Sequence, residues 1–460
     1  MSVMHKYDLS VTEFLQQSHS GNIDYNDFII NYLEALKEFN KKLRLMQCVN
    51  EKTIRPSAEL YGLPVTVKDN ICTRGMQSSA GSKILQGYVP PFDATAVSRI
   101  KDAGGFVAGK TNMDEFGHGT FSVHSAYGIP KNPHDPERTC GGSSGGAAGV
   151  VAAVPFPQIA LCESTGGSIS CPAAFCNVTG LTPTYGLVSR YGLIDYANSM
   201  DKIGVIAKRV DDIALGLSII AGHDKRDSTS LAVQPKQYRV SRDLKGVRIA
   251  VPKEYFENLS PDVEKSVWDA IKLLESNGAA YSEVSLPTTK YALAAYYIIA
   301  TTETSTNLSK MCGMRYGLHK ELEGNFNQYF SSVRSEGFGE EAKRRIILGT
   351  FARMSGYREQ YYMKAMRVRT LITQDFKKIF SKHDVIAAPT MPTPAPKFSE
   401  IEKLTPLQNY QMDVLTVPPN LSGIPMISVP CGHTVGLHLL GDHLQEEKIL
   451  GVAAAYEGLR

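Results

Sequence analysis

The chain has 460 residues, of which 43% are hydrophobic and 21% are charged, and its formal net charge is +3. This composition is typical of a soluble globular protein with a large core and excludes a disordered or fibrous chain. The sequence has no block of Lys and Arg that would mark a strong nucleic-acid binder, and no apolar run reaches the ~18 to 20 residues that a membrane helix requires.

Residues 1–55 are predicted to form a helical segment at the start of one large domain, residues 1–460. Apolar residues between Phe14 and Leu36 recur at helical spacing, which indicates a pair of helices packed on the core. The first 22 residues contain acidic side chains and no arginine, so they resemble neither a secretory signal nor an Arg-rich transit peptide.

The segment Leu63–Asn70 is predicted to be a strand. Its alternation places Val65 and Val67 on one face and Thr66 and Lys68 on the other. Lys68 therefore lies at a strand end, where sites in α/β sheets form.

Gly104–Thr111 matches the P-loop pattern G-x-x-x-x-G-K-[ST]. A P-loop requires a strand before its first glycine and a helix after it. Here Ala94–Ala103 has helical periodicity and Phe106–Ala108 is itself strand-like. We expect no phosphate site at this position.

Two serines in glycine-rich loops flank a segment of small residues within Cys140–Pro172. Gly145–Val154 is predicted to be a helix of ~15 Å, and Gln158–Cys162 a returning strand of ~16 Å. Because these lengths match, Ser143 and Ser168 are expected to lie side by side. A serine nucleophile needs a base, and this stretch contains no histidine.

Lys68 is the candidate base for the serine pair, because burial favours the uncharged amine. Taken alone, Lys68 would more often be a solvated lysine, and Ser143 or Ser168 a loop hydroxyl that bonds nearby backbone. The three together favour a catalytic interpretation. Backbone N–H groups of Thr165 and the glycines Gly166 and Gly167 would then stabilise the oxyanion.

Strands and helices alternate in the second half of the chain, which predicts an α/β layered fold without a domain boundary. The predicted elements are a strand at Gly246–Pro252, a helix at Asp262–Asn277, a strand at Ala280–Ser285, helical sequence at Lys343–Phe380 interrupted near Gly349 and Gly356, and a buried strand at Val385–Pro389.

Four short motifs resemble the amidase-signature family: V-K-D-N at residues 67–70, G-G-S-S-G-G at 141–146, T-G-G-S-I at 165–169 and G-L-T-P-T-Y-G at 180–186. The resemblance implies a mixed central sheet flanked by helices. It also implies a Ser-Ser-Lys triad in which Lys68 is the base, Ser143 the bridging serine and Ser168 the nucleophile.

Longer phrases, such as G-K-T-N-M-D-E-F at residues 109–116, are similar to the glutamine-hydrolysing A subunits of tRNA-dependent amidotransferases. This resemblance implies a glutamine pocket with Arg345 for the α-carboxylate, Asp413 for the α-ammonium and Tyr296 on the wall. It implies no cofactor or metal in this chain. A partner, the B subunit of such enzymes, would use ATP and Mg²⁺ on Glu-tRNA(Gln), together with a small third subunit.

The nucleophile loop departs from the family pattern D-T-G-G-S-I-R, because Ser164 and Ser170 replace its acidic and basic residues. This substitution predicts the joint loss of an ion pair.

The eight cysteines include no C-x-x-C pair, so a reducing compartment is expected, with neither zinc nor structural disulfides. The departures from the family pattern at Ser164 and Ser170 resemble a fungal mitochondrial version of the family. This resemblance implies that the protein is located in the mitochondrial matrix or otherwise in the cytoplasm.

Two other functions remain open from the sequence. A free-standing amidase for small or lipid amides would lack the pair formed by Arg345 and Asp413 and would need an apolar channel. A catalytically impaired scaffold subunit would account for the altered serine loop.

Overall fold

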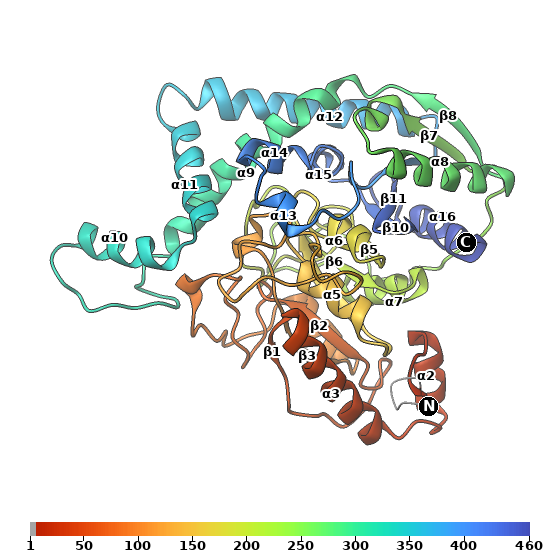
Figure 1. Cartoon of the computed structure of the whole chain (residues 1–460), viewed down its shortest axis with the longest axis horizontal. Coiled ribbons are helices and arrows are strands. Elements are labelled where there is room, and N and C mark those ends of the chain that lie inside the picture. Colours follow the sequence, from red (N-terminus) through yellow and green to blue (C-terminus); the bar gives the residue numbers. More distant parts are fainter. Residues whose placement is uncertain (1–5) are drawn as a thin grey trace.

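The computed structural model describes residues 6–460, which fold around one mixed sheet of 11 strands in the order β1-β3-β2-β4-β6-β5-β10-β11-β9-β7-β8. The strands are β1 (Met46–Val49), β2 (Pro64–Lys68), β3 (Phe106–Thr111), β4 (Ile159–Ser164), β5 (Thr179–Thr182), β6 (Lys202–Ala207), β7 (Arg248–Pro252), β8 (Ala280–Val284), β9 (Val385–Pro389), β10 (Met426–Gly432) and β11 (Val435–Leu440). Helices flank this sheet (Figure 1), and the α/β fold expected from the sequence is confirmed.

The α-helices are α2 (Val11–His19), α3 (Tyr25–Leu43), α4 (Thr95–Asp102), α5 (Gly145–Ala153), α6 (Ser170–Phe175), α7 (Val210–Ile220), α8 (Pro261–Ser276), α9 (Ala292–Asn307), α10 (Phe326–Gly337), α11 (Glu340–Arg353), α12 (Lys364–Phe380), α13 (Phe398–Ile401), α14 (Pro406–Gln411), α15 (Val417–Ser422) and α16 (Glu446–Leu459). Short helical turns are η1 (Lys83–Leu85), η2 (Glu115–Gly117), η3 (Lys253–Phe256), η4 (Pro287–Tyr291), η5 (Leu308–Lys310) and the π-turn η6 (Glu359–Met363). In the part of the chain that the structure describes, none of these helices is both long and apolar enough to cross a bilayer.

The N-terminal helices α2 and α3 form the predicted helical pair on the core. Ser10 begins α2 with a capping box, and Asp24 begins α3 by accepting from two backbone N–H groups. The chain then enters the sheet at β1, which pairs antiparallel with β3. Within its described residues, the segment 1–55 therefore contains the two helices, this edge strand and irregular stretches such as residues 50–55.

Strand β3 contains the end of the P-loop pattern, so the glycine and lysine of that motif are not in a loop before a helix. Lys110 is fully buried in β3, and its Nζ donates to Ser78 Oγ at 2.8 Å. The lysine thus fixes the loop after β2.

Helix α11 runs without a break through Gly349, so the interruption predicted there is wrong. A Cβ at Gly349 would lie 1.8 Å from the carbonyl oxygen of Thr301 in α9. The glycine therefore permits two helix backbones to meet, and α9 and α11 pack closely together (Figure 1). The predicted interruption at Gly356 is confirmed, because this residue has φ +83° in the turn after α11.

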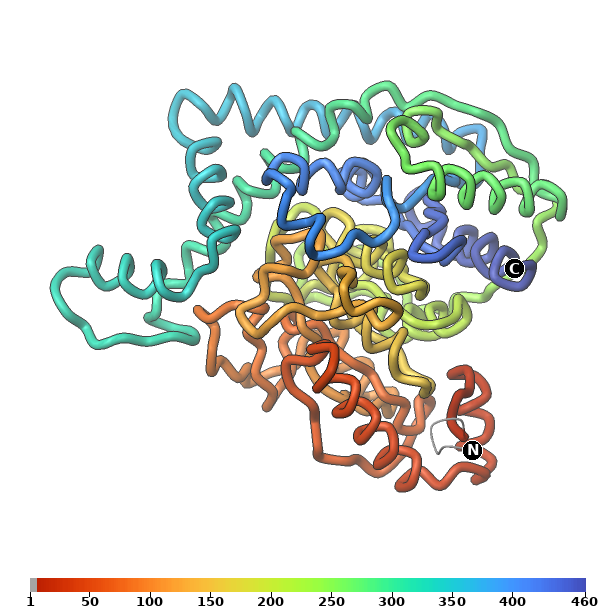
Figure 2. Tube along the Cα trace, in the orientation of Figure 1, coloured from red at the N-terminus to blue at the C-terminus, as the bar shows by residue number. Residues whose placement is uncertain are grey.

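Figure 2 traces the path of the chain from the N-terminal third, at one end of the body, to the C-terminal strands and helices that cover its other side. The loop before α10 and α10 itself project from the body (Figures 1 and 2). The sheet joins both halves, since β10 pairs with β5 from the first half and β11 pairs with β9.

Candidate active site

Lys68 and Ser143 meet at the carboxyl edge of the central strands. Lys68 Nζ donates to Ser143 Oγ at 2.7 Å and to the Glu163 carbonyl oxygen at 2.9 Å. All three residues are essentially inaccessible to solvent. The contact expected between the candidate base and the bridging serine is therefore present.

The sheet topology explains this contact. Strands β2 and β4 are parallel neighbours, so their carboxyl ends, Lys68 and Ser164, lie at the same edge. Ser143 lies just before α5, the small-residue helix predicted from the sequence, and its carbonyl oxygen accepts from Asp114 N at 3.2 Å.

Ser168 lies at the end of the loop that follows β4. Its residue is 6% exposed, whereas Lys68 and Ser143 are fully buried. Its hydroxyl has no hydrogen-bond partner within residues 6–460, so it is the accessible hydroxyl of the serine pair. We call Lys68, Ser143, Glu163 and Ser168 the catalytic floor, after the role that is proposed for them below.

The loop before Ser168 presents free backbone donors. The N–H groups of Gly166 and Gly167 have no acceptor in the described part of the chain. A Cβ at Gly166 would lie 2.5 Å from Tyr296 Oη, and one at Gly167 would lie 2.5 Å from Thr416 Oγ1. Glycine is therefore needed for this close approach, and the free N–H groups can stabilise an oxyanion. The N–H group of Thr165, the third donor expected from the sequence, also has no acceptor in the described part of the chain, and the Thr165 hydroxyl contacts two carboxylates.

Arg345 lies on the inner face of α11 and is 3% exposed. Its Nε donates to Glu341 Oε1 at 2.8 Å, and its Nη1 donates to Tyr196 Oη at 2.5 Å. The guanidinium carbon also lies 5.4 Å from the ring centroids of Tyr297 and Tyr410. The surface salt bridge that would be the ordinary role of such an arginine is thus excluded.

Asp413 lies between α14 and α15 beside the same rings. Its carboxylate accepts from Thr120 Oγ1 at 3.0 Å and from Tyr297 Oη at 2.6 Å, and Tyr297 stacks on Tyr410 with centroids 4.2 Å apart. Burial raises the pKa of Asp413, while the hydrogen bonds from Tyr297 and Thr120 act in the opposite direction. Tyr297 thus links Arg345 to Asp413.

Tyr296 also contacts the nucleophile loop, as the contact at Gly166 shows. The structure therefore brings the three predicted substrate residues to one side of the catalytic floor. We call this set the tyrosine wall: Tyr196, Tyr296, Tyr297, Tyr410, Arg345 and Asp413.

Sequence reasoning missed several residues that contact the predicted ones, among them Glu163, Asp201, Tyr297 and Glu341. The i, i+4 spacing of Glu341 and Arg345 on one helix was a signal for their pairing. A glutamate at the end of an otherwise apolar strand was the signal at Glu163. Asp201 and Tyr297 had no comparable signal, because their contacts come from distant parts of the chain.

The two serines that depart from the family pattern do not bond each other. Ser170 Oγ lies 3.2 Å from His438 Nε2, and Ser164 Oγ is buried with no partner in residues 6–460. Burial lowers the pKa of His438 to about 3, so this ring is neutral. The contact between Ser170 and His438 is therefore neutral, at the position where the family pattern has a basic residue.

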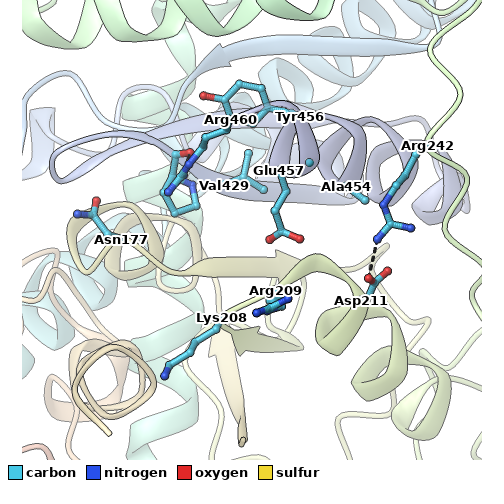
Figure 3. Close-up of a pocket in the computed structure, with 12 residues that line it drawn as sticks. Asn177, Lys208, Arg209, Asp211, Arg242, Val429, Ala454, Tyr456, Glu457 and Arg460 are labelled. Carbon is cyan, nitrogen blue, oxygen red and sulfur yellow. Dashed lines mark hydrogen bonds and ion pairs between the residues drawn. The ribbon is translucent and has the colours of Figure 1, made fainter. Parts of the chain in front are cut away.

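A surface cavity of about 440 Å³ lies elsewhere, at the opposite edge of the sheet (Figure 3). Its lining includes Lys208 and Arg209, which follow β6, whereas the catalytic floor lies at the start of that strand. Glu457 points into this cavity (Figure 3), and its carboxylate accepts from Val210 N at the beginning of α7. A structural role for Glu457 therefore accounts for its position.

A protein-family model described as Amidase matches residues 11–450 of the chain. The A subunit of glutamyl-tRNA(Gln) amidotransferase from Methanococcoides burtonii is 51% identical over 404 residues, which is 86% of this chain and 84% of that protein. The protein of the same name from Geobacillus sp. is 45% identical over an alignment of 478 positions, which covers 99% of this chain and 98% of that protein.

Solved structures agree with the sequence similarity. The crystal structure of the A subunit of glutamyl-tRNA(Gln) amidotransferase from Thermotoga maritima matches with a TM-score of 0.84 at 38% identity, covering 98% of this chain and 94% of that chain. Native peptide amidase from Stenotrophomonas maltophilia matches with a TM-score of 0.82 at 27% identity, covering 98% and 96%.

Proposed function

The chain belongs to the amidase family, and we propose that it is the glutamine-hydrolysing A subunit of a glutamyl-tRNA(Gln) amidotransferase. The observation that carries this proposal is the 45% identity to such a protein along 99% of the chain. The buried contact between Lys68 and Ser143 and the accessible Ser168 support the hydrolytic chemistry.

In the proposed reaction, Ser168 is the nucleophile. The uncharged amine of Lys68 accepts the Ser168 proton through Ser143 while Ser168 Oγ bonds to the amide carbon of glutamine. The N–H groups of Gly166 and Gly167 stabilise the oxyanion, and loss of one such donor typically costs about 3 kcal/mol. The proton returns through Ser143 to the leaving ammonia, and water then hydrolyses the glutamyl ester.

The tyrosine wall is proposed to bind the amino-acid end of glutamine. Arg345 has guanidinium edges for a carboxylate, and Asp413 supplies negative charge for an ammonium. Tyr296 borders the pocket beside Gly166. The ion pair with Glu341 and the contact with the Tyr297 ring hold the Arg345 side chain in one position. The guanidinium is thus already oriented when a ligand binds.

The ammonia is proposed to pass to a partner, the B subunit, which uses ATP and Mg²⁺ to convert Glu-tRNA(Gln) to Gln-tRNA(Gln), in a heterotrimer with a small third subunit. An exposed apolar patch supports such an assembly, formed by Ile347, Leu348, Phe351, Met354, Tyr357 and Tyr361. The Phe351 ring lies 4.6 Å from that of Tyr357. Contiguous exposed apolar surface is typical of protein interfaces. A mitochondrial location, or otherwise a cytoplasmic one, stays a prediction from the sequence.

The two alternatives fit the geometry less well. A free-standing amidase for small or lipid amides has no need of a buried arginine and a buried aspartate beside the same tyrosine, as Arg345 and Asp413 are beside Tyr297. An impaired scaffold has no need of the contact between Lys68 and Ser143.

The experiment compares Ser168→Ala with the original enzyme in the assembled complex. Glutamine-dependent transamidation is expected to be abolished while ammonia-dependent transamidation is retained, since Ser168 only generates ammonia. Ser170→Ala, which changes the serine two residues later at the start of α6, is the matched control and is expected to keep glutamine use. Wild-type glutamine use by Ser168→Ala would refute the nucleophile, and failure of free ammonia to support the reaction would refute the division of labour.

A further inference from the structure

A buried carboxylate lies against the proposed base. Glu163 Oε2 is 2.9 Å from Lys68 Nζ, and the side chains are 1% and 0% exposed. Asn70 Nδ2 donates to the same oxygen at 3.1 Å. A Cβ at Gly117 would lie 3.4 Å from Glu163 Oε2 and 3.5 Å from Ser143 Oγ, so the carboxylate and the serine share one narrow space.

The other oxygen of Glu163 leads to a second carboxyl group. Thr165 Oγ1 lies 2.6 Å from Glu163 Oε1 and 2.7 Å from Asp201 Oδ1. A threonine hydroxyl has a single proton and can donate to only one acceptor. Both short contacts are satisfied only when one of the two carboxyl groups is protonated and donates to the threonine oxygen.

Of the two carboxyl groups, Asp201 is the one whose surroundings favour the protonated form. It is fully buried, and besides Thr165 its oxygens contact only the backbone N–H groups of Tyr196 and Ala197 among the described hydrogen bonds. Burial raises the pKa of Asp201 well above its usual range, and the charge of Glu163 acts in the same direction. Glu163, by contrast, has the ammonium of Lys68 beside it.

We propose that Glu163 and Asp201 share one proton through Thr165, and that Glu163 is a positioning residue that sets whether Lys68 is charged. The proposal rests on the proposed function. With the proton on Asp201, Glu163 is anionic and holds Lys68 as an ammonium. When the Asp201 O–H bond breaks, its proton passes to Thr165 Oγ1 while the Thr165 proton passes to Glu163 Oε1. The negative charge then lies on Asp201, away from Lys68, so the ammonium is less stabilised. One of its N–H bonds breaks, the proton leaves to solvent water, and the uncharged amine is then the base.

Other charged or titratable groups surround this carboxyl pair. Two of them are carboxylates: the charge of Lys68 acts on Asp114, and Asp195 adds negative charge near Asp201. Two others contact Tyr196: the His118 ring packs on it with centroids 4.7 Å apart, and Arg345 donates to its hydroxyl. The last is Lys202, which follows Asp201 in the chain. Burial lowers the pKa of Lys202 to about 7. Asp195 is itself paired with Lys310 at 2.7 Å, so it serves as a control position.

The test is the pH dependence of glutaminase kcat/KM in the assembled complex. Glu163→Gln removes the negative charge beside Lys68, and the acidic limb is expected to move to lower pH by about 1 to 3 units. Asp201→Asn cannot supply a proton, so Glu163 stays anionic and the limb is expected to move to higher pH. Asp195→Asn removes a charge that is paired with Lys310 and has no direct contact with the carboxyl pair, so it is expected to move the limb much less than either change.

The direction of the Asp201→Asn shift discriminates the shared proton from a simple charge effect. If Asp201 were an ordinary anion, its neutralisation would move the limb to lower pH, as Glu163→Gln does, and the proposal would be overturned. An unchanged limb in Glu163→Gln would overturn it too.

Infrared difference spectroscopy gives a readout that does not depend on activity. The carboxylic-acid C=O band of the original enzyme is expected to lose intensity in Asp201→Asn, and an undiminished band would refute the shared proton even if the variants were inactive. Thermal unfolding checks that each variant is folded. The outcome for Ser168→Ala separates failures: if that variant loses glutamine use and the pH profiles do not shift, only the role of Glu163 is refuted.

Discussion

The catalytic floor and the tyrosine wall are formed by different kinds of secondary structure. The floor is placed by two parallel strands, β2 and β4, and by loops that adjoin them. The wall is assembled from α9, α11 and the turn between α14 and α15, which lie on separate parts of the chain. Strand ends fix reacting groups with little freedom, whereas packed helices can shift as units. We therefore expect changes in the floor to affect kcat and changes in the wall to affect KM.

The largest effect is expected for Lys68→Ala. Removal of the base should lower the glutaminase kcat by about 10⁴-fold, as is typical for a member of a catalytic triad, with KM little changed. Steady-state glutaminase assays of the assembled enzyme measure both values. Residues that act as a unit are not additive, so the double variant with Ser143→Ala should be no slower than the single one. If the fold-losses in kcat of the two single variants multiplied in the double variant, Lys68 and Ser143 would not act as one unit.

Arg345→Lys tests the wall. Lysine keeps the charge but loses the fork that contacts Glu341 and Tyr196, and hydrogen bonds to charged groups contribute about 1.5 to 3 kcal/mol. We expect KM for glutamine to rise by about 10- to 100-fold with a smaller change in kcat. Arg344→Lys, the neighbouring and partly exposed arginine, is the control. A loss confined to kcat would show that Arg345 behaves like a residue of the catalytic floor. It would contradict the division of kcat and KM effects between the floor and the wall.

Gly349→Ala tests the packing that holds the wall. The new methyl group would collide with the Thr301 carbonyl of α9, and such overpacking costs about 1 to 3 kcal/mol of unfolding free energy. Chemical denaturation measures this loss. Gly458→Ala in α16 is the control, because a Cβ there meets nothing within 4 Å. Equal stability of both variants would mean that α9 and α11 do not need this close contact.

The smallest effect concerns the beginning of α11. Glu115 accepts from Gly339 N at 2.9 Å, and burial raises its pKa to about 7 from an ordinary 4.5. The folded protein therefore retains a proton that the unfolded chain releases, and unfolding free energy falls as pH rises between about 4.5 and 7. The slope is at most about 1.4 kcal/mol per pH unit.

Glu115→Gln should remove this decline, as thermal unfolding at several pH values can measure. Glu340→Gln, at an exposed position next to Gly339, should leave the slope unchanged. An unaltered slope in Glu115→Gln would mean that the carboxyl does not couple helix α11 to pH.

The secondary-structure elements that carry the floor were easier to predict from the sequence than those that carry the wall, for physical reasons. The strand at Lys68 and the out-and-back path between Ser143 and Ser168 follow from local periodicity and length. The wall residues were reached only through family resemblance, because no local pattern in the sequence places Arg345 beside Asp413. The predicted break at Gly349 failed, since glycine there serves a contact with another helix.

The contacts of Glu163 were also beyond sequence reasoning. A glutamate at the end of a strand gives no indication of which neighbouring strand it faces. Its pairing with Lys68 depends on the register of β2 against β4. The link to Asp201 further requires the antiparallel pairing of β4 with β6.

The central claim is that Ser168 carries the glutamyl group during ammonia release. The most direct measurement is rapid acid quenching of the assembled enzyme with glutamine, followed by peptide mapping with mass spectrometry. The account predicts a glutamyl ester on the peptide that contains Ser168, assigned to that residue by fragmentation and absent from Ser168→Ala. A glutamyl adduct on Ser143 or Cys171 instead would contradict it.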